Sequence, residues 1–158
     1  MELKYILIFL LGFLSCAFLV YGVGYSNVEI PFATGLVNSD VSAPNDWVDT
    51  DDIVVFDDMV ILRIPNATLS SYADSGSMKP VFDKGANGIR VVPESADDID
   101  LGDIVSYRFG KILVVHRVVE KGIDEDGTYF IMKGDNNLLS DERVRFEDIE
   151  YVTIGVIW

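Results

Sequence analysis

Three short segments of this 158-residue chain carry side chains whose types and spacing could do chemistry. The segment DSGSMKP contains a flexible Ser-Gly-Ser turn that can present the hydroxyl of Ser77. The apolar segment VVHRVV contains His116, the single histidine of the chain. The segment KGDNNLLSD is a polar turn with Asp135 and Asp141 near its ends. Each segment alone is ordinary, because Ser, Gly, Asn and Asp are common turn formers and a strand histidine is commonly a packed core residue.

Taken together, the three segments predict a serine nucleophile with its proton acceptor. A serine hydroxyl needs a base, and that base needs a carboxylate that fixes its tautomer and stabilises the imidazolium. We therefore expect Ser77 Oγ to attack a scissile carbonyl, His116 to accept its proton and return it to the leaving amine, and Asp141 to orient His116. The nearest candidate donors to the oxyanion are the backbone N–H of Ser77 and the hydroxyl of Ser75.

The elements that must position these side chains are predicted to be β-strands. Short runs rich in β-branched and aromatic residues recur along the chain, bounded by Gly, Asp or Asn. Alternation places His116 and Val114 on one face of their strand and Val115 and Arg117 on the other. The pattern predicts a mainly β domain, a twisted and mostly antiparallel barrel or sandwich. The predicted strands are Ile53–Phe56, Met59–Ile64, Ile89–Pro93, Ile104–Arg108, Ile112–Val119, Tyr129–Lys133 and Tyr151–Trp158.

The N-terminal part has a different composition. Twenty-one consecutive residues, 5–25, carry no charge, and at 1.5 Å rise per residue about 20 residues span the hydrocarbon core of a bilayer. We therefore expect one N-terminal transmembrane helix; a cleaved signal peptide, whose apolar part is usually shorter, fits less well. Lys4 precedes the run and no Lys or Arg follows up to Leu62, so the N-terminus is predicted to be cytoplasmic and the body extracytoplasmic.

The chain is accordingly divided into four parts. Residues 1–4 form a cytoplasmic tail, 5–25 the transmembrane anchor, 26–69 an acidic linker or extension with a β-hairpin, and 70–158 the catalytic β domain. The aspartates of the linker are interpreted as a solvated face; a cation site is the alternative, but they lack the spacing of loop ligands. The sequon at Asn66 is compatible with a location outside the cytoplasm.

Composition excludes several classes of site and partner. The formal net charge is −14 and the basic residues are scattered, so no nucleic acid partner is expected, because binding phosphates requires a basic face. The single cysteine, Cys16, permits no internal disulfide and no multi-cysteine metal site. A single histidine also removes the usual zinc sites. We therefore expect no metal, and no cofactor is implied because the single histidine is used for proton transfer.

The three segments resemble those of a known family, signal peptidase I of the archaeal and endoplasmic-reticulum type. The motifs that carry the resemblance are SGSMKP, HRVVE and KGDNN followed by an aspartate, in the family's order and behind an N-terminal anchor. The resemblance implies that Ser77 is the nucleophile, that His116 is the base and that Asp141 completes the triad. It further implies that Ser75 assists the oxyanion hole and that Asp135 is important without clearly belonging to the triad.

The resemblance also implies a fold and a function. The fold is the twisted antiparallel β domain of signal peptidases behind one transmembrane helix. The function is cleavage of N-terminal signal peptides from exported preproteins by a membrane-anchored serine endopeptidase. Substrates are expected to carry small residues before the scissile bond and to bind as an added strand, with Val114 and Val115 in the pocket walls. The expected partners are preprotein signal peptides, the lipid bilayer and a translocase or accessory subunits.

Two features depart from the family pattern. Lys84-Gly85-Ala86 stands where the family has Gly-Asp, and the 52 positions from Tyr25 to Ser77 make a longer spacer. Both favour an alternative, a catalytically inert membrane-anchored β-module that binds exported peptides or a translocase partner. A LexA-like peptidase, which has a related fold, uses a Ser-Lys pair in the cytoplasm. That class fits poorly because the chain has an export-oriented anchor and no DNA-binding head.

Overall fold

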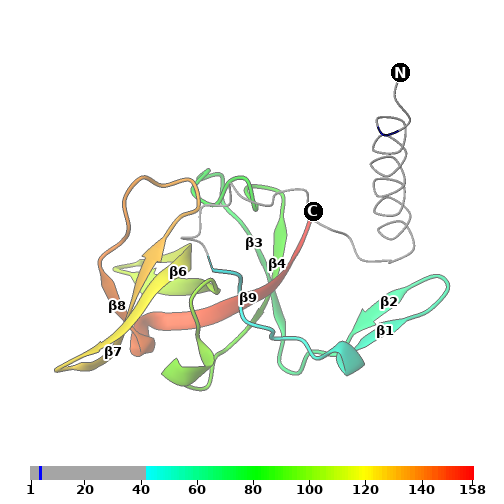
Figure 1. Ribbon diagram of the computed structural model, residues 1–158, viewed down its shortest axis with the longest axis horizontal. Helices are drawn as coiled ribbons and strands as arrows, with labels where there is room; N and C mark the ends of the chain where they lie inside the picture. The colour runs from blue at the N-terminus through cyan, green and yellow to red at the C-terminus, as the bar shows by residue number, and fades with distance from the viewer. Residues whose placement is uncertain (1–3, 5–41) are drawn as a thin grey trace. The chain divides into compact units, whose positions relative to one another are not determined.

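The computed structural model describes residue 4 and residues 42–158. Within these residues the chain forms nine β-strands and three short 3-10 helices (Figure 1). Seven strands form one sheet in the order β3-β4-β9-β5-β6-β7-β8, and β1 and β2 form a separate hairpin. The strands are β1 (Ile53–Val55), β2 (Val60–Leu62), β3 (Thr68–Ser71), β4 (Asn87–Val91), β5 (Ile104–Phe109), β6 (Ile112–Asp124), β7 (Gly127–Lys133), β8 (Arg143–Arg145) and β9 (Ile149–Ile157). The helices are η1 (Thr50–Asp52), η2 (Ala96–Asp98) and η3 (Phe146–Asp148).

The main part of the predicted fold class is confirmed. The described residues are mainly β, and every strand pair among them is antiparallel. The sequence analysis does not predict β3 and β8, whose sequences TLSS and RVR lack an apolar run. These two strands form the edges of the large sheet, β3 on β4 and β8 on β7. Pairing with a neighbour, rather than local propensity, therefore determines their conformation.

Two hydrophobic clusters lie on opposite faces of the β5–β6 hairpin. Neighbouring residues of β5 divide between them: Val105 belongs to the first cluster and Ile104 to the second. The same division holds along β6, where Val114 packs against the first cluster and Val115 against the second. Burying one such aliphatic side chain contributes about 1.5–3 kcal/mol to stability. The hairpin is thus fixed by packing on both of its faces.

The predicted membrane anchor lies outside the described residues. Residues 5–25, Cys16 among them, and the beginning of the predicted linker as far as residue 41 belong to the part that the structure leaves undescribed. In the part of the chain that is described, no helix combines the length and the apolar composition needed to cross a membrane.

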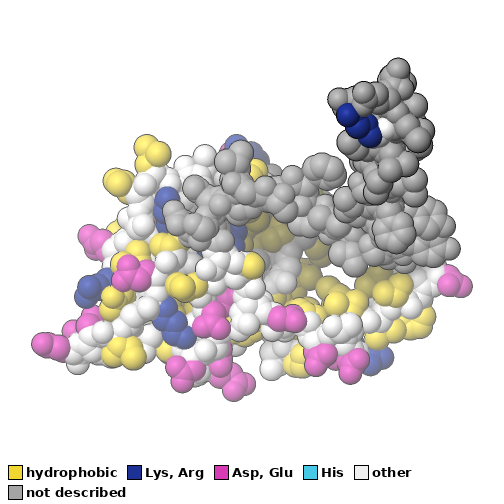
Figure 2. All heavy atoms as spheres, viewed as in Figure 1, with side chains coloured by type: hydrophobic (Ala, Val, Ile, Leu, Met, Phe, Trp, Pro, Cys, Tyr) yellow, Lys and Arg dark blue, Asp and Glu magenta, His cyan; other side chains and the backbone are white. Residues whose placement is uncertain are grey.

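The middle of the predicted linker contacts the large sheet at the residue directly before β5. Asn45 donates its backbone N–H to Asp103 Oδ1 at 2.8 Å, and the indole N–H of Trp47 donates to the same oxygen at 3.1 Å. Asp103 is fully buried at the start of β5. By contrast, β1 and β2 expose apolar side chains, visible as hydrophobic surface in Figure 2. The buried carboxylate of Asp103 thus holds the segment that contains Asn45 and Trp47 against the start of β5.

Candidate active site

The β5–β6 hairpin sets the surroundings of His116. The strands are joined by a two-residue turn, Gly110-Lys111, in a register that places Val105 directly opposite His116. Tyr107 lies opposite Val114, two pairs closer to the turn, so its side chain shares the face of His116. The centroids of the tyrosine and histidine rings are 6.4 Å apart. Both side chains are buried.

One carboxylate oxygen receives two hydrogen bonds on this face. His116 Nδ1 lies 2.6 Å from Asp141 Oδ2, and the hydroxyl of Tyr107 donates to the same oxygen at 2.8 Å. Burial, reinforced by the neighbouring carboxylate, raises the pKa of Tyr107 above its usual value, so the phenol remains a hydrogen-bond donor. With Nδ1–H directed at an ionised carboxylate, a neutral imidazole keeps its lone pair on Nε2. Nε2 is therefore the atom of His116 that can accept a proton.

Ser75 and Ser77 lie in a tight turn that follows β3. Gly76 between them has a φ of +70°, in the left-handed region that favours glycine. The two serine hydroxyls are 3.2 Å apart, and the backbone N–H of Ser77 points toward Ser75 Oγ at 3.4 Å. The next residue, Met78, is buried in the second hydrophobic cluster. The turn is thus anchored in the core directly after the candidate nucleophile.

Asp83 holds the same turn from its C-terminal side. Its carboxylate accepts the backbone N–H of Gly76 at 3.0 Å and pairs with Lys79 Nζ at 2.8 Å. The hydrogen bond from Lys79, followed by that from Gly76, lowers the pKa of Asp83 to about 2. The carboxylate is therefore charged at neutral pH. Asp83, which binds the serine turn, directly precedes Lys84-Gly85-Ala86, the segment that departs from the family pattern.

The loop between β7 and β8 lies against the serine turn. Asn136 donates its backbone N–H to Ser77 O at 2.8 Å and its side-chain amide to Gly76 O at 3.1 Å. A Cβ atom on Gly134 would lie 2.8 Å from Ser77 O, closer than real Cβ contacts. Glycine at this position therefore permits the loop to approach the main chain of Ser77.

Asp135 is joined to Arg117 rather than to the histidine. Arg117 Nε and Nη2 each donate to one of its carboxylate oxygens at 2.8 Å, and Nη1 donates to Gly102 O at 2.7 Å. Both side chains are largely buried, and removing one partner of such a pair costs about 3–5 kcal/mol. Across residues 42–158, no hydrogen bond connects Asp135 to Ser77 or His116. This ion pair fixes the β7–β8 loop at Asp135. The next residue, Asn136, binds the main chain of the serine turn.

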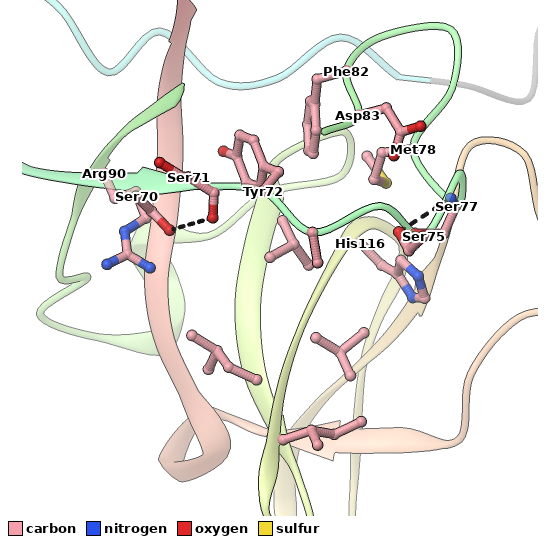
Figure 3. A pocket seen from close by; sticks show the side chains of 15 residues that line it. Ser70, Ser71, Tyr72, Ser75, Ser77, Met78, Phe82, Asp83, Arg90 and His116 are labelled. Atoms are coloured by element: carbon pink, nitrogen blue, oxygen red, sulfur yellow. Dashed lines mark hydrogen bonds between the residues drawn. The ribbon is translucent and has the colours of Figure 1, made fainter. Parts of the chain in front are cut away.

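A pocket of about 460 Å³ opens beside these segments. Ser75, Ser77 and His116 all line it, and Figure 3 shows the three side chains together at one end. Val114 and Val115, the expected wall residues, also line it. The structure thus brings Ser77 and His116 to one cavity and joins His116 to Asp141.

The sequence analysis does not single out Tyr107 and Asp83. A signal for Tyr107 was present, because a two-residue turn at Gly110-Lys111 fixes the β5–β6 register and hence the face that Tyr107 shares with His116. No local signal marks Asp83, since its contact with Gly76 depends on the shape of the whole turn.

Curated proteins named signal peptidase complex catalytic subunit SEC11 share sequence with this chain. The protein from Clavispora lusitaniae is 39% identical over 69 residues, which are 42% of this chain and 40% of that protein. The protein from Pyricularia oryzae is 35% identical over 80 residues, 49% of this chain and 46% of that protein. The resemblance to signal peptidase I is confirmed. The chain spans less than half the length of these relatives, no family model matches it, and no solved structure matches it.

Proposed function

We propose that this chain is a membrane-anchored serine endopeptidase that cleaves N-terminal signal peptides from exported preproteins. The observation that carries the proposal is the 2.6 Å contact between His116 Nδ1 and Asp141 Oδ2, beside a pocket that Ser77 and His116 both line. The names of the similar proteins support the substrate class, because they describe catalytic subunits of a signal peptidase complex. The uncharged run of residues 5–25 supports the anchor.

The proposed reaction begins when Ser77 Oγ attacks the carbonyl carbon of the scissile bond. Nε2 of His116 accepts the serine proton, and the Asp141 carboxylate stabilises the resulting imidazolium. Collapse of the tetrahedral intermediate breaks the C–N bond, and the imidazolium protonates the leaving amine. Water, activated by the same imidazole, then hydrolyses the ester on Ser77 and releases the signal peptide with a new carboxyl terminus.

The negative charge of the tetrahedral intermediate needs donors next to Ser77. The backbone N–H of Ser77 and the hydroxyl of Ser75 lie 3.4 Å apart, so one oxyanion could accept from both. The Asn136 and Asp83 contacts hold the backbone on either side of this N–H. This arrangement supports the oxyanion role proposed for Ser75.

The pocket supports the proposed mode of substrate binding. Val114 and Val115 give it apolar walls suited to small residues before the scissile bond. The edge strand β3 and the residues after it line the pocket, which would let an extended peptide bind as an added strand. The relatives' names include the word complex, so accessory subunits or a translocase are the proposed protein partners. The bilayer is the proposed partner of residues 5–25.

A second candidate is the inert peptide-binding module. One observation favours it: within the described residues, the hydrogen-bond partner of Ser77 Oγ is Ser75 Oγ rather than His116. Catalytic hydrogen bonds are often loose in a free enzyme and shorten when substrate binds. A hydrogen bond between Ser77 and His116 in the complex with substrate is therefore expected of the peptidase and not of the binding module.

The test is cleavage of a model preprotein by the full chain in detergent, beside its Ser77→Ala variant. We expect the wild type to release a signal peptide whose mass places the cut after a small residue, and the variant to release none. Circular dichroism of both proteins controls for folding. Failure of the folded wild type to cut, in the presence of candidate accessory subunits, would favour the binding module.

A further inference from the structure

The pocket carries a cation at the end remote from the candidate nucleophile. Arg90 of β4 lines this end, and Figure 3 shows it beside Ser70 and Ser71, away from Ser77. The two serines belong to β3, which pairs with β4 in a register that places Gly88 opposite Ser70. A peptide that lies along the pocket from Ser77 therefore approaches Arg90 with a residue distant from the scissile bond.

The guanidinium of Arg90 lacks the partner that other arginines have. Within the described residues, no ion pair reaches it, and its Nε is buried without a hydrogen-bond partner. Its plane lies over the ring of Tyr151, with Cζ 3.9 Å from the ring centroid. This cation–π contact holds the guanidinium over the ring, and because Nε is buried, the terminal Nη groups are its donors for a ligand in the pocket. Arginines that do pair with carboxylates are Arg108, Arg117, Arg143 and Arg145.

A second unsatisfied donor lies on the same face of the sheet. Arg90 is opposite Thr153 of β9, and Ser106 of β5 is opposite Tyr151, two residues away on the same strand. The alternation of strands therefore places Arg90 and Ser106 on one face. Ser106 is fully buried, and its hydroxyl has no partner. Ser106 does not line the pocket, so within the described residues Arg90 is the unsatisfied donor that a bound peptide can reach.

The charges around the pocket select an anion. Asp83 also lines it, but the negative charge of Asp83 is compensated by Lys79 at 2.8 Å. Arg90 consequently contributes an uncompensated positive charge, and a planar guanidinium edge matches a carboxylate. We propose that Arg90 binds an acidic side chain of the substrate peptide, several residues before the scissile bond. This inference rests on the function proposed above and names a further feature of its substrate.

The experiment compares peptides that differ in one charge. Peptides spanning a model cleavage region carry Asp or Asn at one position, scanned from the third to the seventh residue before the bond. Their affinity is measured on the full-length Ser77→Ala protein in detergent, so that no peptide is consumed. At one position we expect the Asp peptide to bind about tenfold more tightly, since a hydrogen bond to a charged group contributes that much or more. High salt should reduce this ratio.

Two further variants of the Ser77→Ala protein test whether Arg90 causes the preference for the Asp peptide. Arg90→Gln should bring the Asp/Asn ratio to about one, whereas Arg63→Gln, an exposed arginine that does not line the pocket, should retain it. A ratio near one at every position, or a preference that survives Arg90→Gln, would overturn the inference while leaving peptide binding intact. Failure of the folded protein to bind either peptide would instead count against the proposed function and this subsite together.

Discussion

Replacing His116 with alanine is expected to lower kcat for signal-peptide cleavage by about 10⁶-fold, the scale seen when a serine triad loses its histidine. The alanine side chain leaves Ser77 without a proton acceptor and the Asp141 carboxylate without its imidazole partner. Initial rates of model preprotein cleavage measure the effect.

The control for this variant must separate catalysis from folding. His116 is buried, so His116→Gln is examined as well, because glutamine retains most of the volume and can still donate to Asp141. Circular dichroism should show both variants folded at the assay temperature, and both should be inactive. Lys111→Ala, at the exposed tip of the same hairpin, should cleave normally. Substantial cleavage by folded His116→Ala would remove His116 from the proposed mechanism.

The Asp141→Asn change is expected to lower kcat by about 10⁴-fold. A neutral amide no longer stabilises the imidazolium. When its NH₂ group faces His116 it also selects the tautomer protonated on Nε2, which cannot accept a proton from Ser77. Substrate contacts are unaltered, so KM should change much less than kcat. Steady-state kinetics on the model preprotein measure both constants.

Tyr107→Phe is the graded comparison for Asp141→Asn. It removes one donor to Asp141 Oδ2 and leaves the carboxylate charged and in contact with His116. We expect a loss of about tenfold, the equivalent of one hydrogen bond and far less than the loss in Asp141→Asn, because the carboxylate that orients His116 remains. Equal losses in the two variants would contradict the orienting role assigned to Asp141.

Local sequence predicts the parts of the fold that are apolar and alternating. The run around His116 and the run that begins at Ile104 become β6 and β5, and their alternate residues divide between two hydrophobic clusters. The strands β3 and β8 are not predicted because they are polar edge strands, each of which pairs with a single neighbouring strand. Their conformation depends on residues distant in sequence, which a local pattern does not contain.

In the candidate site, too, local sequence identifies some residues, whereas other contacts depend on the tertiary structure. Residue types and their order are enough to nominate Ser77, His116 and Asp141, and the structure joins the last two by a hydrogen bond. The supports of the serine turn depend on tertiary contacts. Asn136 reaches Ser77 O only because the β7–β8 loop approaches the turn. Asp135 neighbours the site in sequence, yet its charge is engaged by Arg117, which no spacing rule would reveal.

The most direct measurement of the central claim is to trap the covalent intermediate on Ser77. The full chain is mixed with an activated ester of a short peptide that ends in a small residue, quenched in acid, digested and analysed by mass spectrometry. The proposed mechanism predicts an acyl group on the fragment that contains Ser77, absent from Ser77→Ala and greatly reduced in His116→Ala. Turnover of the ester with Ser77 unmodified at all times, or an acyl group on Ser75 instead, would contradict it.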